Sequence, residues 1–137
     1  MLFEHHRDLF YSVVYHNADG AKRGLDGPGL AKMPDGALVA VVPAKLQEGW
    51  HCQVVQSTDR GHSWQPVGKL PYHSAVPWEY QGVLYLFTHP LGTRFRNDDL
   101  LLLRSDDAGK TWSELVTLFE GHFWNCQTGM VIHDNRL

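Results

Sequence analysis

Three short stretches of the sequence concentrate side chains that bind anions, donate protons or stack on rings. A guanidinium can hold a carboxylate through two parallel hydrogen bonds, aromatic faces can cover sugar rings, and an aspartate kept protonated by its surroundings can act as a general acid. Side chains of these types lie in HPLGTRFRNDD (89–99), which includes Asp98 and Asp99, in GHFWNCQ (121–127) and in the connection 72–74, and we predict that together they form a carbohydrate-binding set. The candidate binding residues are His73, His89, Arg94, Arg96, His122, Trp124, Asn125 and Gln127.

The same residues have simpler interpretations, which the sequence leaves open. Arg94, Arg96 and the neighbouring aspartates could form a solvated loop with local ion pairs, each worth little. Trp50, Trp78 and Trp124 could pack between structural units instead of lying under sugars. The histidines and the two cysteines, Cys52 and Cys126, lack the spacing of a zinc site or a disulfide framework, so we assign no metal and no cofactor, and expect two buried free thiols.

An eight-residue pattern occurs twice and shows which elements must position the candidate site. STDRGHSW (57–64) and SDDAGKTW (105–112) both fit Ser-x-Asp-x-Gly-x-(Ser/Thr)-Trp. The turn glycines Gly36 and Gly82 precede the two octets at similar distances, so a whole unit repeats with a period of about 48 residues, which is typical of propeller blades.

Each repeat predicts four strands and no helix. The sequence alternates short apolar runs with Gly, Asp and Pro turns, and no stretch has sustained helical periodicity with caps. We expect a first blade over 28–70, with strands at 30–34, 37–43, 51–56 and 64–70. A second blade covers 74–119, with strands at 75–80, 83–89, 100–104 and 112–119. A leading strand is expected at 9–16, and 125–137 would begin a further blade.

Each octet is predicted to form the hairpin between the third and fourth strands of its blade. The aspartates can accept hydrogen bonds from backbone N–H groups of the turn, the glycines supply positive φ, and the hydroxyls satisfy remaining turn groups. The tryptophans should pack over the hairpin and pin it to the next blade. The structural residues are Ser57, Asp59, Gly61, Ser63 and Trp64 in the first octet, and Ser105, Asp107, Gly109, Thr111 and Trp112 in the second.

Both octets resemble the Asp boxes, or BNR repeats, of the sialidase superfamily of β-propellers. The resemblance implies a propeller whose ligand and catalytic groups lie opposite the octets, on loops between second and third strands and on connections between blades. Sialidases use an arginine triad, an aspartate acid/base and a tyrosine nucleophile activated by a glutamate. Asp98 or Asp99 matches the position of that aspartate, whereas the positions of the family's Arg-Ile-Pro element read GPGLAKMP and HSAVPWEY, without arginine.

Three functions follow from this resemblance and stay open. The chain could be a glycoside hydrolase relative that is active on a sialoside or another glycan only once its ring is complete. It could also be a non-catalytic propeller that binds glycan or protein, or a fragment without independent activity. About ten strands are too few for a six-bladed ring, and open blade edges could join copies of the chain.

Composition excludes other classes of function. The net charge of −3 and a pI near 6.3 give no basic surface for nucleic acid. No apolar run approaches the length of a membrane span, and MLFEHHRDLF lacks the features of a signal peptide, so the sequence as written predicts a cytoplasmic location without fixing the native compartment.

Overall fold

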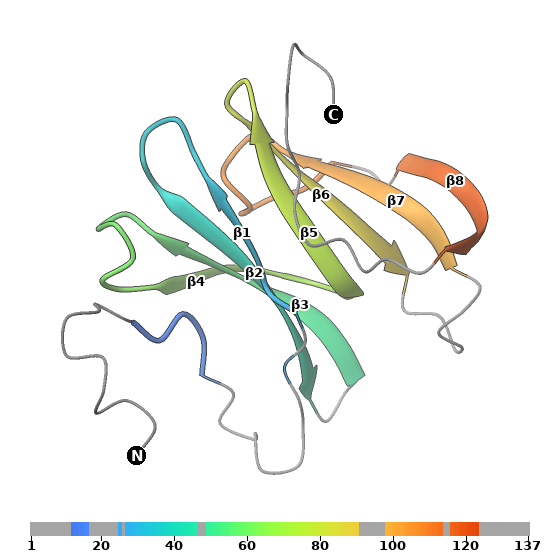
Figure 1. Cartoon of the computed structure of the whole chain (residues 1–137), viewed down its shortest axis with the longest axis horizontal. Coiled ribbons are helices and arrows are strands. Elements are labelled where there is room, and N and C mark those ends of the chain that lie inside the picture. The colour runs from blue at the N-terminus through green and yellow to red at the C-terminus, as the bar shows by residue number, and fades with distance from the viewer. Residues whose placement is uncertain are drawn as a thin grey trace, which may run out of the picture.

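A computed structural model shows an all-β chain with two four-stranded antiparallel sheets (Figure 1). It describes residues 12–16, 25, 27–46, 49–90, 98–113 and 116–123. The first blade contains β1 (Gly29–Lys32), β2 (Leu38–Leu46), β3 (Gly49–Ser57) and β4 (Gln65–Leu70), paired in chain order. The second contains β5 (Tyr72–Tyr80), β6 (Val83–Pro90), β7 (Asp98–Ser105) and β8 (Val116–Phe123), paired likewise. The prediction of two four-stranded blades is confirmed.

Two predictions at the ends of elements need correction. Residues 12–16, which belong to the leading strand expected at 9–16, form no strand in the structure. The last strand of the second blade begins at Val116, later than the expected residue 112, because Trp112 still belongs to the octet hairpin. The strand expected within 125–137 lies outside the described residues.

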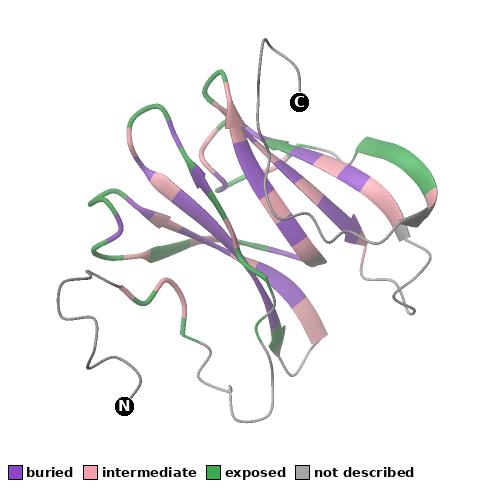
Figure 2. Ribbon diagram, in the orientation of Figure 1, coloured by how far each residue is buried: buried purple, intermediate pink, exposed green. Residues whose placement is uncertain are grey.

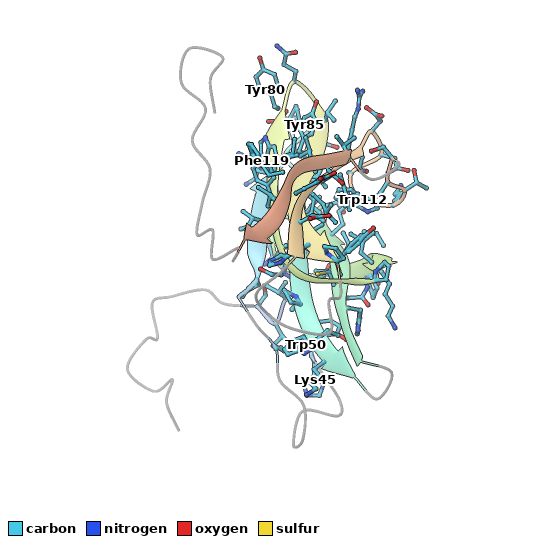
Figure 3. The ribbon with its side chains drawn as sticks, turned by 90° about the vertical axis from the view of Figure 1, so that its right-hand side faces the viewer. Lys45, Trp50, Tyr80, Tyr85, Trp112 and Phe119 are labelled. Atoms are coloured by element: carbon cyan, nitrogen blue, oxygen red, sulfur yellow. The ribbon has the colours of Figure 1, made fainter. Side chains whose placement is uncertain are left out.

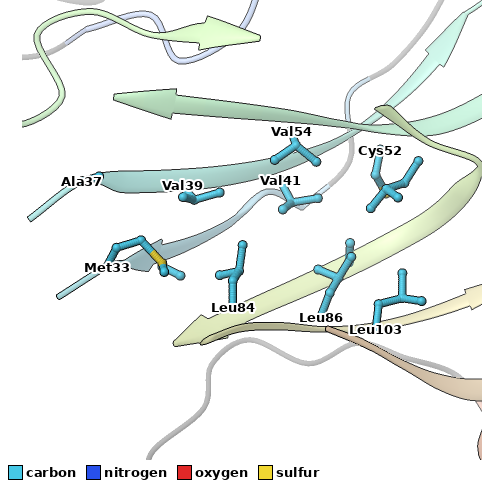
Figure 4. Packing of buried hydrophobic residues seen from close by; sticks show 12 residues of the cluster. Met33, Ala37, Val39, Val41, Cys52, Val54, Leu84, Leu86 and Leu103 are labelled. Carbon is cyan, nitrogen blue, oxygen red and sulfur yellow. The ribbon is translucent and has the colours of Figure 1, made fainter. Parts of the chain in front are cut away.

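The two blades pack face to face through one apolar layer. Strand alternation sends Val39 and Val41 of β2 toward Leu84 and Leu86 of β6, and all four side chains are buried (Figure 4). Cys52 belongs to the same layer; its thiol donates to the Tyr72 carbonyl over 3.2 Å, and burial raises its pKa to about 12. The expectation of a free buried thiol is confirmed for Cys52, and Cys126 lies outside the described residues.

β1 of the first blade lies close against β5 of the second blade at Gly29. A Cβ placed on Gly29 would lie 2.3 Å from Cδ of Pro77 and 3.1 Å from the carbonyl oxygen of Ala75, both on β5. Glycine is therefore required at this position by the spacing of the two blades rather than by its backbone conformation.

Both octets form the predicted hairpins with nearly the same hydrogen bonds. In the second octet the Asp107 carboxylate accepts from the Thr111 N–H at 2.8 Å and from the Thr111 hydroxyl at 2.6 Å. Ser105 accepts from the Gly109 N–H at 2.8 Å, and the Trp112 indole donates to the Gly109 carbonyl at 3.1 Å. In the first octet the corresponding bonds join Asp59 to Ser63, Ser57 to Gly61, and Trp64 to Gly61.

Each hairpin contains two consecutive residues with positive φ, of which the sequence predicts only one. Gly61 and Gly109 have φ values of 87° and 92°, as expected. Arg60 and Ala108, which precede them, also adopt positive φ, at 61° and 57°. Residues with a Cβ adopt this conformation at a cost, so the internal hydrogen bonds of the octet must stabilise it.

The second hairpin packs on the preceding blade, which corrects the expectation that the octet pins its own blade to the next one. A Cβ on Gly109 would meet Cγ1 of Val54 at 2.8 Å, and a Cβ on Gly68 would meet the Gly109 carbonyl oxygen at 2.8 Å. Both Val54 and Gly68 belong to the first blade. In the first octet, the Gly61 carbonyl accepts a hydrogen bond from the hydroxyl of Ser12.

Gly29→Ala should lower the free energy of unfolding by about 1–3 kcal/mol, because the added methyl group overpacks the contact with Pro77. The matched control is Gly27→Ala, since a Cβ at Gly27 meets nothing within 4 Å. Urea unfolding followed by tryptophan fluorescence measures both variants. Equal stability of the two variants would contradict the close approach of the blades.

The octets should also make stability depend on acid pH. The Ser63 hydroxyl and N–H hold the pKa of Asp59 well below its ordinary value, with a further contribution from Ser57. At Asp107 burial acts to raise the pKa, but hydrogen bonds from Thr111 and Ser105 outweigh it and lower the pKa to about 2. A depressed pKa gives stability that is present above about pH 4, the ordinary aspartate value, and lost as the pH falls toward 2.

We expect the urea midpoint of the wild-type chain to decrease between pH 4 and pH 2. The Asp107→Asn variant should have a lower midpoint at pH 7 and a smaller decrease between pH 4 and pH 2. Asp106→Asn is the control, because the Asp106 carboxylate pairs with Arg104 and accepts none of the hydrogen bonds from the residues that follow it in the hairpin. If both variants kept the wild-type pH profile, the Asp107 network would not contribute to acid stability.

Candidate functional site

The described part of the candidate site lies at the end of each blade that is opposite its octet hairpin. Lys45 and Trp50 are paired across β2 and β3 at this end, and Figure 3 shows them together at the lower end of the molecule. Lys45 is exposed and Trp50 is half-buried. An ammonium beside a partly open indole can hold an anionic or hydroxylated ligand against an aromatic face.

The second blade has a strained bulge at the same end. The pairing of β5 with β6 shifts between His73 and Ala75, and Ser74 between them has a φ of 61°. The carbonyl of Ser74 accepts a hydrogen bond from the hydroxyl of Thr88 at 2.8 Å, and Thr88 is fully buried. Bulges re-aim neighbouring side chains, so this pair fixes how β5 enters the blade beside His73.

Asp99 is held by the backbone of the neighbouring strand. Its Oδ1 accepts a hydrogen bond from the Gly121 N–H at 3.0 Å, where the pairing of β7 and β8 is irregular. Gly121 has a φ of 130°, within the range that favours glycine. The carboxylate thus fills an interruption of the β7–β8 ladder, a structural role that requires no ligand.

The structure brings together only part of the predicted set. His89 is buried at the end of β6, opposite His73 in the β5–β6 pairing, and Asp98 and Asp99 begin β7. His122 lies in β8, beside the position at which Asp99 is held. The side chains of His73, Asp98 and His122 lie outside the described residues, as do Arg94, Arg96, Trp124, Asn125 and Gln127 in full.

The Thr88–Ser74 hydrogen bond was not predicted from the sequence. No pattern marks Ser74 as a residue with positive φ, because serine at a bulge resembles serine in a strand or a loop. Trp50 was considered as a sugar platform, but its pairing with Lys45 depends on strand register. Strand register depends on the hydrophobic pattern and the turn geometry of both strands together, so residue type alone does not show that Trp50 is paired with Lys45.

Within the described ranges, no three His, Cys, Asp or Glu side chains are grouped so that they could hold a metal ion. The same ranges contain no helix that is long and apolar enough to cross a bilayer.

Comparison with known proteins gives a partial structural likeness. The chain is similar to the solved structure of "Hadza microbial sialidase Hz136", with 26% sequence identity and a TM-score of 0.48 over 64% of this chain. The match covers 17% of the sialidase, so this chain corresponds to a small part of that protein. No protein-family model and no curated protein matches the chain.

Thr88→Val should lower the free energy of unfolding by about 0.5–1.5 kcal/mol, since valine keeps the shape of the buried Thr88 side chain but cannot donate the hydrogen bond to the Ser74 carbonyl. Thr117→Val, at an exposed position of β8, is the control and should change stability by less than about 0.5 kcal/mol. Urea unfolding of both variants tests this expectation. A neutral Thr88→Val would mean that the bulge does not depend on the hydrogen bond.

Proposed function

We propose that this chain is part of a carbohydrate-recognising propeller of the sialidase type, and that it binds glycan at the end opposite the two octets. One observation carries the proposal: both octets fold as Asp-box hairpins at one end of two consecutive four-stranded blades. The polar groups of the hairpins form hydrogen bonds within the hairpins themselves. We therefore expect ligands to bind at the opposite end of the blades.

The residues at that opposite end fit an acidic or hydroxyl-rich ligand. Lys45 supplies a mobile positive charge, and the half-buried indole of Trp50 supplies a flat apolar surface beside it. A sugar ring with a carboxylate or several hydroxyls could use both at once. Arg94 and Arg96 of the β6–β7 connection would add carboxylate binding.

Binding without hydrolysis is the second candidate, and the hydrogen bond between Asp99 and Gly121 favours it. The Asp99 carboxylate stabilises an interrupted strand pair, and this role alone accounts for an aspartate at this position. It does not require Asp99 to transfer a proton. Hydrolysis would instead need Asp98 or Asp99 to reach a glycosidic oxygen as an acid, in a site completed by further blades.

Tryptophan fluorescence of the full chain, titrated with sialyllactose and with neutral lactose, tests glycan binding. We expect saturable quenching by at least one sugar, and a loss of affinity of tenfold or more in Trp50→Ala and Lys45→Gln. Lys32→Gln is the matched control, because Lys32 is exposed on β1 near the octet end and should not affect affinity. Saturable binding that survives both variants would contradict this location, and no response to either sugar would contradict the proposal.

A fluorogenic sialoside distinguishes the two candidates. Turnover that is lost in Asp99→Asn while binding remains would support a sialidase-like hydrolase. Binding without turnover would support a recognition module.

A further inference from the structure

The face of the second blade that points away from the first blade, its outer face, is buried at its inner strand and exposed at its outermost one. Strand alternation turns Tyr85 and Phe87 of β6 away from the layer between the blades, and both are half-buried. Trp78 of β5 packs against them and is 7% exposed. Phe119 of β8 is 58% exposed, and Figure 2 shows most of β8 in the colour of exposed residues.

The indole of Trp78 indicates what an element covering this face must provide. Its ring centroid lies 5.4 Å from that of Tyr85 and 4.4 Å from that of Phe87. The indole N–H is buried and has no acceptor among the described residues. Buried donors normally have a hydrogen-bond partner, and most side-chain hydrogen bonds are made to backbone groups or water. A covering segment should therefore bring a backbone carbonyl to Trp78.

Strand register shows that Trp78 occupies the position in the second blade that Ala31 occupies in the first. Ala31 pairs with Val39, Trp78 pairs with Tyr85, and the next strand along places opposite each pair the residue that directly precedes an octet. Ala31 lies in the layer between the blades, where β1 contacts β5, the first strand of the next blade. The equivalent cover for Trp78 is the first strand of a further blade.

The sequence supplies such a strand in TGMVIH (128–133), which lies outside the described residues. In each described blade, the first strand is followed by a turn that contains Asp-Gly at 35–36 or Gln-Gly at 81–82. Residues 128–133 are followed by Asp-Asn at 134–135, residue types that are likewise typical of turns. The same order of strand and turn therefore begins a third time after β8.

A glycine in this segment complements the size of Trp78. Between the two described blades, the small residue belongs to the preceding blade, where Gly29 makes room for Pro77. The second blade carries a tryptophan on its outer face, so the small residue must come from the strand that follows. Gly129 lies in an otherwise apolar run, and glycine within a strand is typical of a place where another segment approaches closely.

We propose that residues 128–133 pack on the outer face of the second blade as the first strand of a further blade. Gly129 lies near the Trp78 ring, and a backbone carbonyl of the segment accepts the hydrogen bond from the indole N–H. A single strand placed alongside β5 leaves β8 uncovered, which agrees with the exposure of Phe119.

This packing has a consequence for the glycan site, and that consequence alone rests on the proposed function. Phe123 at the end of β8 pairs with Asp98, at the end of the blade opposite the octet. Residues 124–127 would then connect β8 to the new strand across this end. Trp124, Asn125 and Gln127 would thus lie on the side where ligand binding is proposed.

Photocrosslinking from the outer face tests which segment covers it. Tyr85 is replaced by p-benzoylphenylalanine in the full chain, and tandem mass spectrometry locates the crosslink after illumination. We expect a crosslink within the same chain to residues 128–133. The same photocrosslinker at Thr58, exposed on the first octet, is the control and should not react with this segment. A crosslink to another segment or to a second copy, or crosslinks confined to β5–β8, would overturn the proposal.

Hydrogen exchange of the Trp78 indole tests the fit of Gly129. Gly129→Val should hold the segment away from the ring, so the indole N–H should exchange about tenfold faster, measured by nuclear magnetic resonance. The resonance is assigned from its loss in Trp78→Phe. Gly27→Val is the control, because a Cβ at Gly27 meets nothing within 4 Å. Unchanged exchange in Gly129→Val would contradict the close approach.

The two measurements are independent of sugar binding. Variants are compared only where they retain the far-ultraviolet circular dichroism of the wild type, so faster exchange reports displacement of the segment and not unfolding of the blades. Crosslinking to 128–133 in a chain that binds no glycan would support the packing and contradict the proposed function. Glycan binding without that crosslink would give the opposite result.

Discussion

The close packing of two sheets through small side chains is the constraint on which the rest of the structure depends. Gly29 allows β1 to approach Pro77 on β5, and the valines of β2 leave space for Leu84 and Leu86 of β6. This spacing sets the distance between the blades, and with it the position of the second octet against β3 and β4. The end that carries Lys45 and Trp50 is fixed relative to β5 by the same layer.

The two ends of the blades have different physical characters. At the octet end, polar groups are consumed by hydrogen bonds within each hairpin, and the carboxylates are held in the charged form. At the opposite end, two of the described polar groups stabilise irregularities of the strands: Thr88 stabilises the bulge at Ser74, and Asp99 the interruption opposite Gly121. Ligand recognition in the proposed function would therefore be built on a backbone that already departs from regular pairing.

The fold could be predicted from the sequence largely because the patterns that indicate its strands and hairpins each lie within a short stretch of the chain. Asp59 and Gly61 identify a hairpin within eight residues, and the apolar runs on either side give the strands. The candidate site could be predicted only in outline, since it depends on register and on contacts between distant residues. Ser74 and Thr88 come from two strands, and neither residue type indicates positive φ or a buried hydrogen bond. The direction in which the octet packs was also mistaken, because the sequence of a hairpin does not specify which neighbouring blade it touches.

The side-chain hydrogen bonds of Ser105, Asp107, Thr111 and Trp112 stay within the second octet. Ser105 and Asp107 are satisfied by Gly109 and Thr111, and the Trp112 indole returns to the Gly109 carbonyl. A unit of this kind carries its polar requirements with it when its coding segment is duplicated, because no polar partner elsewhere has to change at the same time. The apolar contacts of a new copy can then diverge one side chain at a time without disturbing the hairpin.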